Sequence, residues 1–201
     1  KNLVSPADQG ADFVELFFDL VFVYAITRIT SLTANNLTVE NVLQSLLIFW
    51  LIWWAWTQYT WALNAANTKI AEVRLTVLIA TGVAFVMASA TDLAFTEGVM
   101  WFAASYVVIR IIGLALYIRV STNFNGHRSA VMGFALLSVT GLIAVLAGAL
   151  VNPSLRIIFW SAAILLDLFA GFIGGRAEGW NLRAKHFAER HSLIVIIALG
   201  E

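Results

Sequence analysis

Long apolar runs separated by short polar connections dominate the chain. A transmembrane helix needs about 20 predominantly apolar residues. Windows of roughly this size occur at residues 13–34, 41–63, 75–91, 99–118, 129–150 and 153–174. A seventh apolar run, residues 193–199, follows a basic segment. No stretch alternates polar and apolar positions as the strands of a membrane barrel do. The pattern predicts an all-α, polytopic transmembrane helix bundle with six complete spans and the start of a seventh.

The basic residues are divided unevenly between the two sides of this predicted bundle. Connections that follow odd-numbered spans hold only Arg156. The N-terminal segment and the connections that follow even-numbered spans hold Lys1, Lys69, Arg74, Arg119, Arg128, Arg176, Arg183, Lys185 and Arg190. Lys and Arg are enriched in the cytoplasmic loops of membrane proteins. The distribution therefore predicts a cytoplasmic N-terminus.

Composition narrows the chemistry that is open to the protein. Hydrophobic residues make up 61% of the chain and charged residues 12%, with a mean hydropathy of +0.86. The formal net charge is zero, which gives no indication of a nucleic-acid partner. The chain has no Cys, which excludes disulfides, Cys-ligated zinc, iron–sulfur clusters and thiol catalysis. No phosphate-binding loop, dinucleotide fingerprint or nucleophile elbow appears. We therefore expect no catalytic residues, no metal, no cofactor and no enzymatic activity.

The ends of the sequence predict a fragment of a longer protein. The chain begins with Lys instead of Met, and the seventh apolar run stops at Glu201 because the chain stops there. We expect residues 1–201 to form a single transmembrane domain. The run that begins at Glu15 aligns without gaps with the run that begins at Glu189, and Val21 then matches Val195. Both runs would start from the same side, so a duplication would be parallel and this chain its first half.

Several polar side chains lie inside the predicted spans at similar depths. Glu15 and Asp19 are four residues apart and share one face of the first helix. Counting about 1.5 Å per residue from the cytoplasmic end places Asp19, Arg110 and Asp167 about 10–13 Å deep, and Gln58 about 8 Å deep. A charge at the bilayer centre costs about 2.5–3.5 kcal/mol on insertion scales. A pair between Arg110 and either Asp19 or Asp167 would lower that cost.

This polar layer has two interpretations. It is either a site for a substrate, ion or proton, or a buried ion pair that fixes helix register and touches no ligand. The surplus of acids over the one arginine favours proton or cation handling. The second span also carries a group of tryptophans, at positions 50, 53, 54, 56 and 61. Such an aromatic wall either binds a cation or an apolar ligand or serves for packing.

Three motifs resemble the bacterial low temperature requirement A family. They are Glu15-Leu-Phe-Phe-Asp-Leu-Val-Phe-Val, the tryptophan-rich segment of residues 53–64, and His186-Phe-Ala-Glu189-Arg190-His191 with the apolar run up to Gly200-Glu201. The family's last motif usually reads Glu-Arg-His-Gly, and Ser192 replaces that glycine. The resemblance implies a full length about twice that of this chain. It also implies motif positions at Glu15, Asp19, Trp54, Glu189, His191 and Glu201, and it implies no established activity.

The leading hypothesis is a multipass protein of the bacterial cytoplasmic (inner) membrane, of transporter or channel type. Its intramembrane polar site would comprise Glu15, Asp19, Gln58, Arg110 and Asp167. The alternative is a non-transporting structural or regulatory membrane protein involved in growth in the cold. The expected partners are the lipid bilayer and an ion, a proton or a small-molecule substrate, with no nucleic acid. The oligomeric state is left open.

Overall fold

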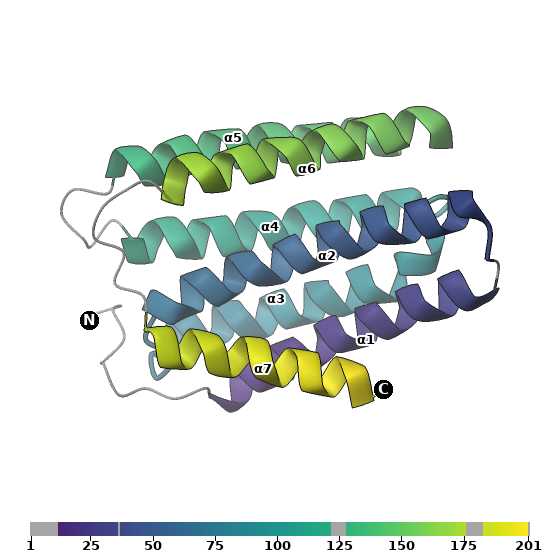
Figure 1. Ribbon diagram of the computed structural model, residues 1–201. Helices are drawn as coiled ribbons and strands as arrows, with labels where there is room; N and C mark the ends of the chain where they lie inside the picture. The colour runs from purple at the N-terminus through teal and green to yellow at the C-terminus, as the bar shows by residue number, and fades with distance from the viewer. Residues whose placement is uncertain (1–11, 36, 122–127, 176–182, 201) are drawn as a thin grey trace.

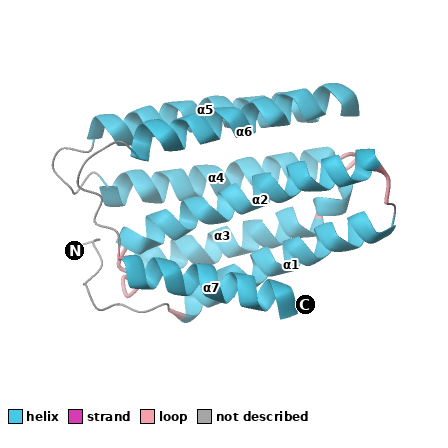
Figure 2. Ribbon diagram, viewed as in Figure 1, coloured by secondary structure: helices cyan, strands magenta, loops and turns pink. Residues whose placement is uncertain are grey.

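The chain is helical throughout the part that the structure describes. The computed structural model describes residues 12–35, 37–121, 128–175 and 183–200. These ranges hold seven α-helices, a 3-10 turn (η1, Thr91–Leu93) and no strand (Figure 2). The helices are α1 (Phe13–Asn35), α2 (Val39–Ala65), α3 (Ala71–Ser89), α4 (Val99–Ser121), α5 (Arg128–Ala149), α6 (Pro153–Gly175) and α7 (Ala184–Gly200). The all-α prediction is confirmed.

Local capping explains two of the helix starts. Thr38 precedes α2, and its hydroxyl accepts a hydrogen bond from the backbone N–H of Asn41 at 3.2 Å. Asn152 precedes α6, and its side-chain oxygen accepts from the N–H of Leu155 at 3.0 Å. Pro153 then occupies the first helical position, where its missing N–H costs nothing. Both ends are therefore fixed by side chains that the sequence places at N-cap positions.

Helices α1 to α6 run up and down in three layers of two, and α7 is a seventh helix beside them (Figure 1). α1 packs against α3, α2 packs against α4, and α5 pairs most extensively with α6. The α5–α6 hairpin lies on α4 and α2, while α7 lies against α1 and α2. The starts of α1, α3, α5 and α7 and the ends of α2, α4 and α6 lie at one end of the bundle. Side chains near the start of α7 can therefore meet those near the start of α1.

Five of the described helices are long and apolar enough to cross a membrane. They are α2, α3, α4, residues Val131–Ala149 of α5 and residues Pro153–Phe172 of α6. α1, which carries Glu15, Asp19 and Arg28, and the shorter α7 are not in this set. Large apolar side chains such as Leu136 and Leu165 point outward and are exposed. Such an apolar exterior is typical of helices that face lipid.

A buried arginine joins α5, α6 and the segment after η1. Arg156 donates to the backbone oxygens of Gly148 (3.2 Å), Val151 (3.1 Å) and Ala94 (3.1 Å). Gly148 and Val151 lie where α5 ends, and helix ends leave carbonyl groups without intrahelical partners. Arg156 supplies those partners at the opposite end of the bundle from the start of α7.

Gly148 of α5 makes room for the Trp160 side chain of α6, and this allows a test with a matched control. A Cβ at Gly148 would lie 2.7 Å from two atoms of the Trp160 indole, whereas a Cβ at Gly133 on the same helix would meet no atom within 4 Å. We expect G148A to lower the free energy of unfolding by about 1–3 kcal/mol through overpacking. G133A should be neutral or stabilise by up to about 1 kcal/mol. Circular dichroism of the full-length protein, unfolded in mixed micelles, measures both. Equal effects of the two variants would contradict this packing.

Candidate functional site

Arg110 on α4 and Asp167 on α6 form a buried, two-pronged ion pair. Nη1 of Arg110 donates to Oδ2 of Asp167 at 2.9 Å, and Nη2 donates to Oδ1 at 2.7 Å. Nη1 also donates to the hydroxyl of Tyr106 at 3.0 Å. Arg110 is fully buried and Asp167 is 3% exposed. One positive and one negative charge therefore cancel at a closed contact between two helices.

Gln58 lies beside this pair without joining it. Its side chain on α2 is buried, and Oε1 would lie 3.2 Å from a Cβ placed on Gly113, one turn after Arg110 on α4. Neither polar atom of the Gln58 amide has a hydrogen-bond partner. The neighbouring Tyr59 hydroxyl donates to the backbone oxygen of Ile109 at 2.8 Å. α2 and α4 are thus joined by Tyr59, while the Gln58 amide remains unsatisfied.

A second group of buried charges, which we call the acid–arginine cluster, joins α1, α2 and α7. It consists of Glu15, Asp19, Trp56, His186 and Arg190, and all five side chains are at most 3% exposed. Arg190 contacts Asp19 through Nη2–Oδ1 and donates through Nε to Oδ2 at 3.3 Å. The indole N–H of Trp56 donates to Oδ1 of Asp19 at 2.7 Å. The guanidinium of Arg190 also lies 5.8 Å from the centre of the Trp56 ring, where the ring attracts a cation.

Glu15 has fewer hydrogen-bond partners than Asp19. Its Oε2 lies 3.2 Å from Nε2 of His186 and 3.4 Å from Nη1 of Arg190. Neither of its oxygens has a hydrogen bond of good geometry, and the same holds for both ring nitrogens of His186. The cluster therefore sets two carboxylates against one guanidinium, with an imidazole beside the carboxylate that lacks a full partner. Within these five residues the two acids face one guanidinium, and Arg183, just before α7, adds a positive charge that acts on Glu15 from outside the cluster.

The polar layer expected from the sequence is thus divided between two clusters. Arg110 pairs with Asp167, one of the two partners that the sequence left open. Glu15 and Asp19 instead face Arg190, which was assigned to a cytoplasmic connection and which the structure places, fully buried, inside α7. One signal could have found this: His186 and Arg190 are four residues apart, as are Glu15 and Asp19. The two acids lie one turn apart on α1, and the two basic residues lie one turn apart on α7, so the two pairs can face each other.

Of the remaining motif residues in the described ranges, His191 contacts the acid–arginine cluster, and Trp54 and Glu189 have other surroundings. His191 packs edge-on against Trp56, with ring centres 4.8 Å apart, and its Nδ1 lies 2.8 Å from the backbone oxygen of Phe187. Trp54 stacks on Trp50, and Glu189 is exposed. Glu201 lies outside the described residues. The aromatic side chains of α2 therefore hold α7 in place and form one wall of the cluster.

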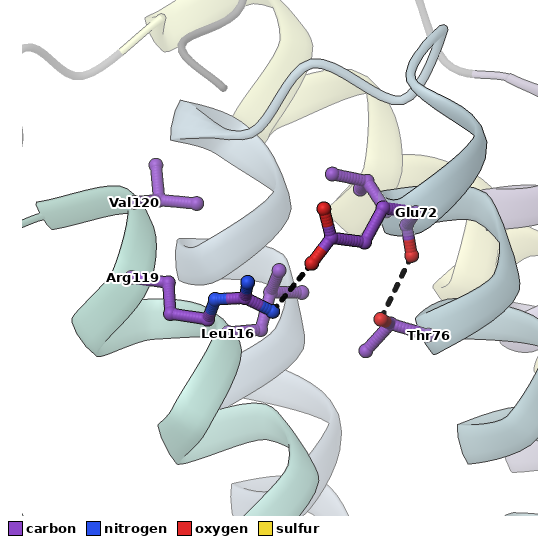
Figure 3. Close-up of a pocket in the computed structure, with 6 residues that line it drawn as sticks. Glu72, Thr76, Leu116, Arg119 and Val120 are labelled. Carbon is purple, nitrogen blue, oxygen red and sulfur yellow. Dashed lines mark hydrogen bonds and ion pairs between the residues drawn. The ribbon is translucent and has the colours of Figure 1, made fainter. Parts of the chain in front are cut away.

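Other ion pairs of the described residues are more accessible, among them Arg28–Asp92 and Arg119–Glu72. Arg28 of α1 contacts Asp92 of η1, and each side chain is about one-third exposed. Arg119 of α4 lies 2.6 Å from Glu72 of α3 and lines a shallow recess with Thr76, Leu116 and Val120 (Figure 3). The recess has a volume of about 10 Å³, room for at most about one water molecule. It offers no space for a larger ligand.

The geometry defines an all-helical protein of membrane-crossing type. Its apolar exterior encloses separate groups of buried charge, and within the described residues no cluster of three or more His, Asp or Glu side chains is arranged to hold a metal ion. The sequence model described as "Bacterial low temperature requirement A protein (LtrA)" matches residues 10–201. The chain therefore belongs to the bacterial low temperature requirement A family. Family membership and the apolar helices together indicate a membrane protein.

A curated relative shows how much of a longer protein the chain represents. An uncharacterized protein of Rhizobium meliloti (strain 1021) is 30% identical to it over 205 aligned residues. The alignment covers 95% of this chain and 49% of that protein. The chain thus spans about half the length of this relative. No solved structure matches the chain.

The Arg110–Asp167 pair yields a prediction about stability. Removing one partner leaves the other charge buried and unpaired, so R110L and D167L should each lower the free energy of unfolding by about 3–5 kcal/mol. R110L/D167L should cost less than the sum of the single variants, with a coupling energy of about 1–3 kcal/mol.

A double-mutant cycle in mixed micelles measures this coupling. The exposed pair provides the control, because the coupling between R119Q and E72Q should be at most about 1 kcal/mol. Additive effects of R110L and D167L would contradict the closed pair.

Proposed function

We propose that this chain provides the cation-binding part of a membrane transport protein, of transporter or channel type, in the bacterial cytoplasmic membrane. The observation that carries the proposal is the charge imbalance of the acid–arginine cluster. Glu15 and Asp19 are both fully buried, and Arg190 is the buried guanidinium that contacts them. An unneutralised buried carboxylate is costly. Two buried carboxylates that share one contacting arginine favour the binding of a positive charge at this position.

The Arg110–Asp167 pair receives a different role in this proposal. Its charges are balanced and its carboxylate oxygens are occupied by the two guanidinium nitrogens. Such a pair supports a structural role, in which α4 and α6 are held in register. Of the five site residues in the leading hypothesis, the proposed site therefore keeps Glu15 and Asp19. It also includes Trp56, His186 and Arg190.

The proposed topology has six crossing helices, α1 to α6, and a cytoplasmic N-terminus. α1 has 23 residues, about 35 Å at 1.5 Å per residue, which is enough to span the hydrocarbon core. Its acids at positions 15 and 19 meet Arg190 within the bundle, which lowers the cost of placing them in a membrane. Lys69, Arg74 and Arg119 lie at the end of the bundle where α1 begins, which supports an orientation with this end inside.

A second candidate function is a non-transporting structural or regulatory membrane protein that supports growth in the cold. The closed Arg110–Asp167 pair favours it, because this contact stabilises the bundle without leaving a place for a ligand. Neither candidate involves a catalytic step. The two differ in what happens when the acids of the acid–arginine cluster are neutralised.

Cation flux distinguishes the two candidates. The full-length protein, reconstituted into lipid vesicles, should move at least one of H⁺, Na⁺ and K⁺ faster than vesicles without protein, as read by internal fluorescent indicators. E15Q and D19N should reduce this flux to the protein-free level, because each removes a negative charge that the bound cation needs. The matched control E72Q changes a carboxylate in the exposed Arg119 pair and should leave the flux unchanged. Absence of flux for all three cations, or full flux in E15Q and D19N, would contradict the transport proposal and favour the second candidate.

A further inference from the structure

The carboxylates of the acid–arginine cluster are not equivalent. Asp19 accepts hydrogen bonds from Trp56 and from Arg190, so its negative charge is matched by a guanidinium and an indole N–H. Glu15 has no hydrogen bond of good geometry although it is fully buried. Glu15 is therefore the carboxylate of the cluster that lacks a hydrogen-bond partner.

The atoms around Glu15 identify the kind of cation that fits. Hard metal cations are held by several oxygen ligands. The atoms that contact Oε2 of Glu15 are nitrogens, Nε2 of His186 and Nη1 of Arg190. A guanidinium 3.4 Å from this oxygen also repels a second fixed cation. A proton needs no ligand shell, and the imidazole 3.2 Å away is the side chain type that changes its charge between about pH 5 and 8.

Among the residues that the structure describes, the other charged groups near Glu15 have contacts of their own. On α1 this is Asp19, paired with Arg190; Asp12, just before α1, lies 3.8 Å from Arg74 of α3. Arg183, just before α7, donates to the backbone oxygens of Leu63 and Asn64 at the end of α2, and its positive charge also attracts Glu15. On α7, Nδ1 of His191 lies within hydrogen-bond distance of the Phe187 backbone oxygen. His186 differs from all of these because both of its ring nitrogens are buried without a hydrogen-bond partner.

We propose that Glu15 and His186 share one exchangeable proton and that this proton is the cation taken up by the protein. The inference rests on the proposed transport function and names its ion. Uptake adds one proton from water to Nε2 of His186, and the new N–H then donates to Oε2 of Glu15. Release returns the proton to water, and no other bond forms or breaks. His186 lies in the first turn of α7, at the end of the bundle where α1 begins, so we place proton access at that end.

Proton binding can be measured without any assay of transport. The full-length protein in detergent is titrated between about pH 8 and 5, and the protons bound per chain are counted against a soluble pH indicator. We expect H186Q to bind one proton fewer than the unmodified protein. E15Q should also bind fewer, because a neutral amide cannot pair with the charged imidazole. The matched control E72Q should keep the full count. If H186Q does not fold, E15Q carries the same test.

The outcomes separate this inference from the transport proposal. A full proton count in H186Q or E15Q would overturn the shared proton, and Na⁺ or K⁺ flux that depends on Glu15 would then leave the transport proposal in place. Loss of one proton in H186Q, together with proton flux that disappears in the same variant, supports both. Loss of one proton without flux of any cation would uphold the shared proton and overturn its role in transport.

Discussion

A charged side chain inside an apolar bundle must meet an opposite charge or hydrogen-bonding groups of the protein, because neither lipid nor apolar side chains can replace its hydration. This requirement joins helices that are far apart in sequence. Asp167 brings α6 to α4 through Arg110, and Asp19 brings α7 to α1 through Arg190. The first contact holds the α5–α6 hairpin on the central layer, and the second fixes where α7 lies. Apolar packing alone would permit many registers between such helices, whereas an ion pair can form in only one of these registers.

The rest of the bundle is adapted to these contacts. Gly113 lets Tyr59 of α2 approach α4 closely, since a Cβ there would lie 2.7 Å from the tyrosine ring. This close approach lies one turn from Arg110. At the opposite end, Arg156 satisfies carbonyl groups where α5 ends, so a third buried guanidinium bonds to the backbone instead of to an acid. The three arginines thus have distinct partners. Arg110 pairs with one carboxylate, Arg156 bonds to backbone oxygens at a helix end, and Arg190 contacts two carboxylates.

Much of this arrangement is predictable from the sequence, and the exceptions have a physical reason. The apolar runs predict α1 to α6 because a 20-residue run in a membrane has little alternative to a helix. Arg110 and Asp167 stand out because they interrupt such runs. Arg190 does not stand out, because it follows Lys185 and Glu189 in a polar segment typical of an interface. The structure extends α7 back to Ala184 and buries Arg190 against α1. The partner of Asp19 depends on which helix covers α1, and this information resides in tertiary packing.

The position of α7 connects the charge of the acid–arginine cluster to the fold. α7 exposes apolar side chains such as Ile196 and Leu199, so its attachment depends on Arg190, on His186 and on aromatic contacts such as His191 with Trp56. A proton on His186 adds attraction between α7 and Glu15. By thermodynamic linkage, proton binding then favours the docked position of α7, and docking favours proton binding by the same factor. A buried carboxylate without a full partner gains most from that proton. In the proposed proton exchange, Glu15 would thus be the residue that couples the packing of α7 to proton binding.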